Sequence, residues 1–184
     1  MSALTVFEEK GFNDTRIKDI TNKARTSVGN FYNYFESKEE VFEELISGFY
    51  GLMIEKLQDL FTYFYEGKIP PISAIKNLFR EYIKMFKAKR KIALIFLEQM
   101  GGISNKHNKM KNEILDGFSN EVEKIISNLL KAGVRDQNPM VTARAWTSTT
   151  LGIFHWWIRH ESEIDDEDRV DNLAGFLIRG TMSK

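Results

Sequence analysis

Residues 27–35 read Ser-Val-Gly-Asn-Phe-Tyr-Asn-Tyr-Phe, and the rest of the chain is organised around them. At helical spacing, the small and polar groups of Ser27, Asn30 and Asn33 fall on one side of this segment. The rings of Phe31 and Phe35 fall on the opposite side. A helix of this kind buries its aromatic side and displays short polar groups, which is typical of a helix lying in a groove of DNA.

A short amphipathic helix is predicted directly before this segment. It spans residues 16–23 with Thr15 as its N-cap. Its apolar positions recur at spacings of three and four: Ile17, Ile20 and Ala24. Arg25 and Thr26 interrupt the pattern, and Ser27 is the expected N-cap of the next helix. Two short helices joined in this way make a helix-turn-helix, whose second helix enters the major groove.

A still earlier helix is predicted at the start of the chain. It makes about two turns, and its apolar positions are Ala3, Leu4 and Phe7. Gly11 follows Lys10 at the point where a glycine of left-handed conformation would end the helix. The N-terminal part of the chain is therefore expected to contain three short helices in succession.

About a dozen positions in register carry a family resemblance. They are Phe7-Glu8-Glu9-Lys10-Gly11-Phe12, Thr15, Asp19-Ile20, Ser27, Gly29, Phe31-Tyr32, Tyr34-Phe35 and Ser37-Lys38-Glu39. This set closely resembles the DNA-binding domain of the TetR family of bacterial transcriptional regulators. The resemblance covers about residues 3–46, a quarter of the chain.

The resemblance implies roles for particular positions. Phosphate contacts would come from Thr15, Tyr32 and Lys38. Base edges would be faced by Ser27, Val28, Asn30 and Asn33, with Gly29 allowing close approach. The turn residues Arg25 and Thr26 complete the predicted DNA-binding set. The predicted core positions are Phe31, Tyr34 and Phe35.

Two features depart from the family pattern. The family usually has further residues before the first helix, whereas this chain begins Met1-Ser2-Ala3. Either the true reading frame starts earlier or the first helix is short, which would weaken the packing of the DNA-binding domain. Arg25 stands at a turn position where glycine is common. An arginine of positive φ has a backbone cost there, but it adds a positive charge near the phosphates.

The remainder of the chain predicts an all-α fold of about nine helices. Ser37 and Glu40 form a capping box, and a continuous apolar stripe follows to about residue 64. The strongest break is at residues 66–71. The later helices are expected at about residues 72–86, 92–100, 110–133, 139–159 and 169–182. We expect a DNA-binding domain at residues 1–46 and a ligand-binding and dimerisation domain at residues 47–184.

Composition excludes several other functions. The chain of 184 residues has no cysteine, which rules out disulfides, thiolate catalysis and cysteine-bound zinc and agrees with a cytoplasmic location. His155 and His160 lie about 140° apart around a helix, so they do not converge on one metal. No catalytic constellation, cofactor motif, export signal or membrane span is apparent. The acidic run 165–168 is most simply a solvated loop.

Charge distribution agrees with DNA binding in the N-terminal part. The whole chain has 26 basic and 26 acidic residues, and so a net charge of zero. Residues 10–38 nevertheless carry six basic residues against three acidic ones. The local excess of positive charge therefore lies where the DNA is expected.

The resemblance also implies an effector cavity and a homodimer. The helices between residues 38 and 158 would surround the cavity. Its expected walls are Tyr82, Phe86, Phe96, Met100, Phe118, Trp146, Phe154 and His155. An apolar or aromatic small molecule would fit this lining. The last two helices, at about residues 139–159 and 169–182, would form the interface with a second copy.

The sequence thus predicts a ligand-responsive transcriptional repressor that binds a palindromic operator as a homodimer. The alternative is a helical ligand-binding dimer whose DNA-binding domain is impaired, because the first helix is short and the net charge is zero. An enzyme and a purely structural dimer are weaker alternatives.

Overall fold

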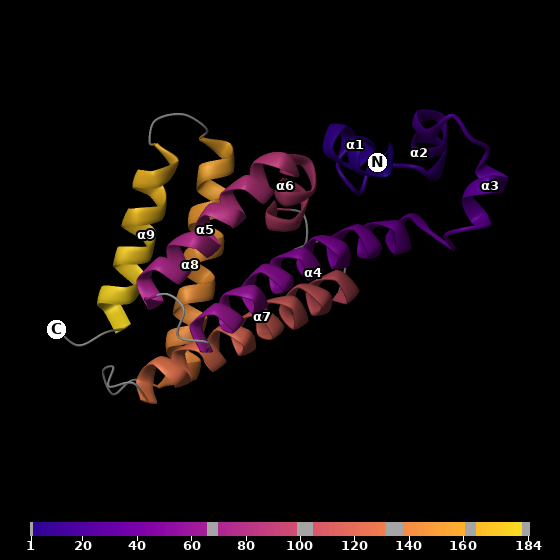
Figure 1. Cartoon of the computed structure of the whole chain (residues 1–184). Helices are drawn as coiled ribbons and strands as arrows, with labels where there is room; N and C mark the ends of the chain where they lie inside the picture. Colours follow the sequence, from indigo (N-terminus) through magenta and orange to yellow (C-terminus); the bar gives the residue numbers. More distant parts are fainter. Residues whose placement is uncertain (1, 66–69, 99–104, 132–137, 161–164, 182–184) are drawn as a thin grey trace. The chain divides into compact units, whose positions relative to one another are not determined.

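The computed structural model of the chain describes residues 2–65, 70–98, 105–131, 138–160 and 165–181 (Figure 1). Within these ranges the regular structure is helical. The helices are α1 (Ser2–Lys10), α2 (Ile17–Ala24), α3 (Val28–Tyr32), α4 (Lys38–Tyr65), α5 (Pro71–Ala88), α6 (Arg90–Glu98), α7 (Asn105–Lys131), α8 (Pro139–Arg159) and α9 (Asp166–Thr181). The predicted all-α fold is confirmed. None of the described helices is both long enough and apolar enough to cross a membrane.

The helices belong to two compact units. Unit 1 comprises residues 1–51 and 89–111, and unit 2 comprises residues 52–88 and 112–184. Helices α4 and α7 each contribute to both units. The units are therefore interleaved along the chain, unlike the contiguous functional division at residue 46, which stays a prediction. Periodicity along a sequence identifies helices but does not show which distant helices pack together.

Unit 1 is built around a cluster of aromatic rings. Phe42 of α4 is fully buried, and its ring centroid lies 4.8 Å from that of Phe12 and 5.7 Å from that of Phe7. His107 of α7 packs at 5.4 Å from Phe12 and 5.3 Å from Phe42. Helix α1 packs against α2 and α6. The cluster thus fixes the turn after α1 against the first turns of α4 and α7.

The stability of unit 1 is expected to decrease as the pH falls. Burial lowers the pKa of His107 from its ordinary 6.5, although Glu43 and Glu39 partly oppose this effect. The folded state therefore binds a proton less readily than the unfolded state. Stability is greatest above pH 6.5 and is lost as the pH falls through the lower folded-state pKa.

Hydrogen exchange of unit 1 amides between about pH 7.5 and pH 5, corrected for intrinsic rates, measures this effect. The variant His107→Leu should remove most of the pH dependence. An unchanged pH dependence in that variant would assign the effect to other groups.

Local end signals place several helices as predicted. Gly11 has a φ of 79°, as expected for a left-handed residue after α1. The hydroxyl of Ser27 accepts from Asn30 N at 3.0 Å, and the side chain of Asn138 caps α8 before Pro139. The predicted cap Thr15 is wrong, since the N-cap of α2 is Arg16. The backbone N–H of Arg16 donates to the Asp19 carboxylate at 2.9 Å, and this bond takes the place of a threonine cap.

Helix α3 is shorter than predicted, and this changes the position of one aromatic side chain. It ends at Tyr32, so the residues after it leave the helical spacing. Phe31 is buried as expected, and its ring packs against that of Phe35 at 5.6 Å. Tyr34, predicted to be core, is 74% exposed. The prediction for Tyr34 is wrong because it assumed a continuous helix to residue 35.

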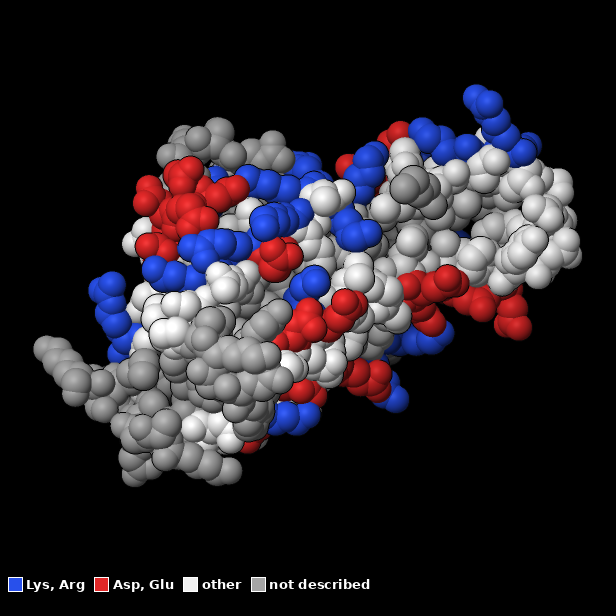
Figure 2. Space-filling model, viewed as in Figure 1, with Lys and Arg blue, Asp and Glu red and all other residues white. Residues whose placement is uncertain are grey.

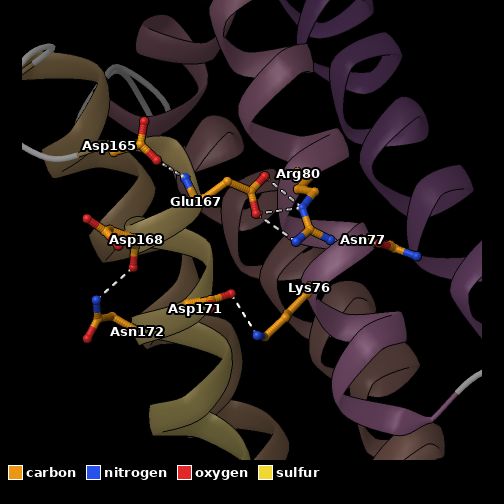
Figure 3. Close-up of polar contacts among 8 residues, drawn as sticks. All are labelled: Lys76, Asn77, Arg80, Asp165, Glu167, Asp168, Asp171 and Asn172. Atoms are coloured by element: carbon orange, nitrogen blue, oxygen red, sulfur yellow. Dashed lines mark hydrogen bonds and ion pairs between the residues drawn. The ribbon is translucent and has the colours of Figure 1, made fainter.

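Unit 2 is held together by apolar packing and by ion pairs between α5 and α9 (Figure 3). The Arg80 guanidinium donates to both carboxylate oxygens of Glu167, at 2.7–3.0 Å, and Lys76 pairs with Asp171 at 2.7 Å. In Figure 2 acidic side chains gather over α9, with basic side chains beside them. The acidic run that the sequence assigned to a loop therefore largely begins α9, where carboxylates stabilise a helix N-terminus.

Candidate nucleic-acid interface

The turn between α2 and α3 is set by the backbone conformation of Arg25. Its φ of 54° and ψ of 45° are left-handed. The N–H of Arg25 donates to Asn22 O at 3.1 Å, and the N–H of Thr26 donates to Thr21 O at 3.0 Å. These two bonds make the Schellman motif, which usually has glycine at the left-handed position. The turn that leads into α3 is therefore well defined although it contains a strained arginine.

Replacing Arg25 with glycine is expected to stabilise unit 1 by about 1 kcal/mol, because glycine adopts this conformation without strain. The same change should weaken binding to all DNA sequences and lower the salt slope by about 0.9, since one charge near the phosphates is lost. Amide hydrogen exchange and DNA titrations in several salt concentrations measure the two effects. The control Arg25→Lys keeps both the strain and the charge. Equal losses of affinity in both variants would contradict the electrostatic explanation.

The exposed side of α3 carries the side chains predicted to meet base edges. Ser27, Val28, Gly29, Asn30 and Asn33 are all exposed. Helix α3 contains no charged residue, and the surface over it in Figure 2 is mostly uncharged. Such a surface can enter a groove and read hydrogen-bonding groups or thymine methyls without a charged side chain.

Asn30 is held in place by its neighbours. Its side-chain amide donates to the hydroxyl of Thr26 at 2.8 Å, and its backbone N–H is bonded to Ser27. An amide nitrogen has a second hydrogen, so one donor and the carbonyl oxygen remain available to a base. Thr26 therefore orients the side chain of Asn30, a residue predicted to contact a base, in addition to forming part of the turn.

The predicted phosphate contacts differ in accessibility. Tyr32 is 55% exposed, so its hydroxyl is accessible to a phosphate. Thr15 is 1% exposed, and its hydroxyl donates to Gly11 O at 2.6 Å, so it is not presented to a ligand. The ammonium of Lys38 donates to backbone carbonyls of the turn after α1. Their roles in DNA binding stay predictions.

Some of the local positive charge is neutralised within unit 1. Lys10 pairs with Asp19 at 2.8 Å, and the bonds from Lys10 and from the Arg16 N–H lower the pKa of that carboxyl. Lys23 pairs with Glu9 at 2.9 Å. Among the described residues, three exposed cations of this region have no ion-pair partner: Arg16, Lys18 and Arg25. These three are the charges available to a phosphate backbone.

Unit 2 contains a small apolar cavity of about 30 Å³. Its lining comes from α4, α5, α7 and α8, and its polar members are Tyr82, Thr147 and Thr150. Tyr82 is fully buried, which raises the pKa of its hydroxyl, and the hydroxyl donates to Met53 O at 2.8 Å. The Thr147 hydroxyl is buried and has no hydrogen-bond partner among the described residues. A cavity of this volume holds only one or two waters, so a larger ligand requires it to expand.

The predicted cavity residues are only partly brought together. Tyr82, Phe118 and Trp146 line the cavity. Phe86 and Phe154 are buried beside it, with ring centroids 4.9 Å apart, and Phe154 lies 6.0 Å from Tyr82. Two others do not join this group: Phe96 packs on Phe49 in unit 1, and His155 is half-buried outside the lining. Met100 lies outside the described residues.

Sequence reasoning missed the two threonines of the cavity. The sequence analysis gave neither Thr147 nor Thr150 a place in the cavity. The two threonines are three residues apart on α8, so their hydroxyls lie on one side of an otherwise apolar helix. That pattern was the available signal for polar groups in the cavity.

Comparison with known proteins supplies a family match. A sequence model described as "Bacterial regulatory proteins, tetR family" matches residues 2–45. The HTH-type transcriptional repressor DhaR of Mycobacterium sp. (strain GP1) is 32% identical over 83 residues, covering 43% of this chain and 38% of DhaR. The chain spans less than two thirds of the length of the first curated relatives that it matches.

Solved structures match over nearly the whole chain. The fatty acid degradation regulator FadR of Bacillus halodurans is 20% identical, with a TM-score of 0.78 and coverage of 97% of this chain and 95% of that protein. The transcriptional regulator FadR of Bacillus subtilis, solved in complex with stearoyl-CoA, is 19% identical, with a TM-score of 0.77 and the same coverage. At these identities the likeness shows a shared fold.

Proposed function

Since the chain belongs to the TetR family of bacterial regulatory proteins, we propose that it is a DNA-binding transcriptional repressor. Its recognition element is α3, presented by the turn at Arg25 and anchored by buried Phe31. The observation that carries the proposal is the division of α3 into a buried aromatic side and an exposed side of short, uncharged groups. That division suits a helix inserted in the major groove.

Two substitutions test this proposal on DNA from upstream of the protein's own gene. Tyr32→Ala should weaken binding to every sequence by about 1–3 kcal/mol, because a phosphate contact carries no sequence information. Asn30→Ala should reduce affinity by a similar amount, about 1–3 kcal/mol, and relax the preference at one base pair. Titrations against a set of single-base-pair operator variants distinguish the two patterns. Equal losses on all sequences for both variants would contradict the base-reading role of Asn30.

The repressor would act as a homodimer through α8 and α9. Four large apolar side chains of these helices are exposed: Met140, Val141, Trp156 and Phe176. Other side chains of α9, including Val170 and Leu173, are buried in unit 2. Exposed apolar residues on neighbouring helices are typical of a surface that a partner covers. A two-fold dimer presents two α3 helices about 34–36 Å apart, which matches a palindromic operator.

The effector that the geometry of the cavity supports best is an acyl-CoA, whose hydrocarbon chain would enter the cavity of unit 2. The lining is apolar apart from three hydroxyls. A hydrocarbon chain suits such a lining, because it brings no polar group that would need a hydrogen-bond partner there. Stearoyl-CoA bound to the structurally similar FadR of Bacillus subtilis agrees with this class. Because the cavity is small, an acyl chain must select an expanded state. Because α4 belongs to both units, a change in its position is the proposed route to α3.

A titration of the protein–DNA complex with stearoyl-CoA tests the effector, with free CoA and stearate as separate arms. Stearoyl-CoA should release DNA, and a useful response needs a difference in affinity of a few kcal/mol between the two states. Val122 of α7 lines the cavity. The variants Val122→Phe, which should fill the cavity, and Val122→Ala, which should enlarge it, form a matched pair. The first should abolish release, and the second should retain it. Release by free CoA alone would contradict binding of the chain in the cavity.

The alternative function is a helical ligand-binding dimer with an impaired DNA-binding unit. It is favoured by the small number of exposed cations without an ion-pair partner in residues 10–38, which are Arg16, Lys18 and Arg25. A protein of this kind would bind acyl-CoA without binding its own upstream DNA. A steep salt slope on that DNA excludes it.

A further inference from the structure

Lys38 occupies an unusual position for a predicted phosphate ligand. Its ammonium donates to the carbonyl oxygens of Phe12 at 2.8 Å, Asn13 at 3.1 Å and Thr15 at 2.9 Å. The same nitrogen lies 4.6 Å from the centroid of the Phe12 ring. All three carbonyls belong to the turn between α1 and α2. An ammonium has three hydrogens, so its donors are fully used by the protein itself.

The two ends of this contact have different mechanical roles. Lys38 is the first residue of α4, where the Ser37 hydroxyl accepts from Glu40 N at 3.2 Å. The carbonyls belong to the turn that ends at Arg16, the N-cap of α2. Phe12 of this turn also packs against Phe42, one turn further along α4. The start of α4 is therefore joined to the start of α2 by both polar and apolar contacts.

We propose that Lys38 is a positioning residue, which holds the turn before α2 on the first turn of α4 and carries displacements of α4 to the helix-turn-helix. The proposal rests on the proposed DNA-binding function. It assigns to Lys38 a role different from a phosphate contact, because a phosphate would have to displace one of three carbonyls. Displacement of α4 would then move the turn, α2 and, through the turn at Arg25, the recognition helix α3.

Hydrogen exchange tests the contact without DNA. In the full-length variant Lys38→Met, which keeps the length of the side chain but has no donor, amides of residues 12–20 should exchange about tenfold faster or more. Lys18→Met is the matched control, because Lys18 is an exposed cation of α2 outside this contact. It should leave exchange unchanged. Unchanged exchange in Lys38→Met would overturn the proposal.

DNA binding then separates positioning from phosphate contact. If Lys38 positions α2, the affinity of Lys38→Met for upstream DNA should fall about tenfold or more. Its affinity for random duplex DNA and its salt slope should stay unchanged. Lys38→Arg should behave similarly, since a planar guanidinium cannot direct three donors at the same carbonyls. A phosphate contact predicts the opposite pattern. The affinity of Lys38→Met would then fall equally for both DNAs, its salt slope would be smaller by about 0.9, and Lys38→Arg would bind both DNAs normally. That pattern would overturn the proposal.

The failure of the proposed function has a different signature. Wild-type protein that binds neither DNA, but shows the faster exchange in Lys38→Met, would refute DNA binding and leave the contact itself established. If Lys38→Met does not fold, Lys38→Arg supplies both readouts. Normal exchange together with normal upstream affinity in Lys38→Arg would then overturn the positioning role.

Discussion

Replacing Phe42 with alanine is expected to destabilise unit 1 by about 3–5 kcal/mol, the usual range for a large aromatic residue in a core. The ring is fully buried between Phe7, Phe12 and His107. Its removal would leave a cavity at the point where α1, α4 and α7 meet. A loss of this size approaches the entire stability of a small domain, so we expect DNA binding to be lost with the folded unit.

The tryptophans allow the two units to be followed separately. All three, Trp146, Trp156 and Trp157, belong to unit 2. In urea, tryptophan fluorescence of Phe42→Ala should keep nearly the wild-type midpoint, whereas hydrogen exchange of unit 1 amides should accelerate strongly. Tyr34→Ala is the control, because this exposed aromatic should contribute within about 0.5 kcal/mol. An equal fall of the fluorescence midpoint in Phe42→Ala would show that the units unfold together.

Replacing Phe176 with glutamate is expected to dissociate the proposed dimer. The side chain is 67% exposed on α9, the largest exposed fraction among the four apolar residues of this surface. A charge at the centre of an apolar interface should cost about 2–4 kcal/mol, which corresponds to roughly 30- to 1000-fold in the dissociation constant. Operator affinity should fall with it, because a monomer contacts one half-site only.

Sedimentation over a range of protein concentrations, together with operator titrations, measures this effect. Phe176→Leu is the matched control and should remain dimeric, since it keeps an apolar side chain. Because Phe176 is exposed, the thermal midpoint of monomeric unit 2 should be little affected. A Phe176→Glu protein that stays dimeric would place the interface elsewhere.

The helix-turn-helix was predictable because its signals are local. A cap at Ser27 and a left-handed residue at Gly11 act within one or two turns of the chain, and both were found where expected. The same local rules failed where two partners competed. Thr15 has the chemistry of a cap, but its hydroxyl bonds to Gly11 O, and the N-terminus of α2 is stabilised by Asp19 instead.

The contacts between distant segments were not predictable. His107 precedes the helix predicted at about residues 110–133, yet α7 already begins at Asn105 and buries this histidine in the aromatic cluster. Nothing near His107 in the sequence identifies Phe12 and Phe42 as its neighbours. Glu167 similarly pairs with Arg80 across a long separation in the chain. Charge alone does not reveal its partner, so the acidic run was interpreted as solvated.

The interleaving of the two units has a consequence for protein synthesis. Helix α1 packs on α6, and Phe42 packs on His107, so the N-terminal unit lacks part of its core until residue 107 has left the ribosome. By then the ribosome has already produced α5, which belongs to the other unit. The nascent chain therefore cannot complete its first unit in strict order from the N-terminus, as chains with contiguous domains do. During this interval the apolar face of α1 depends on α2 and α4 for cover.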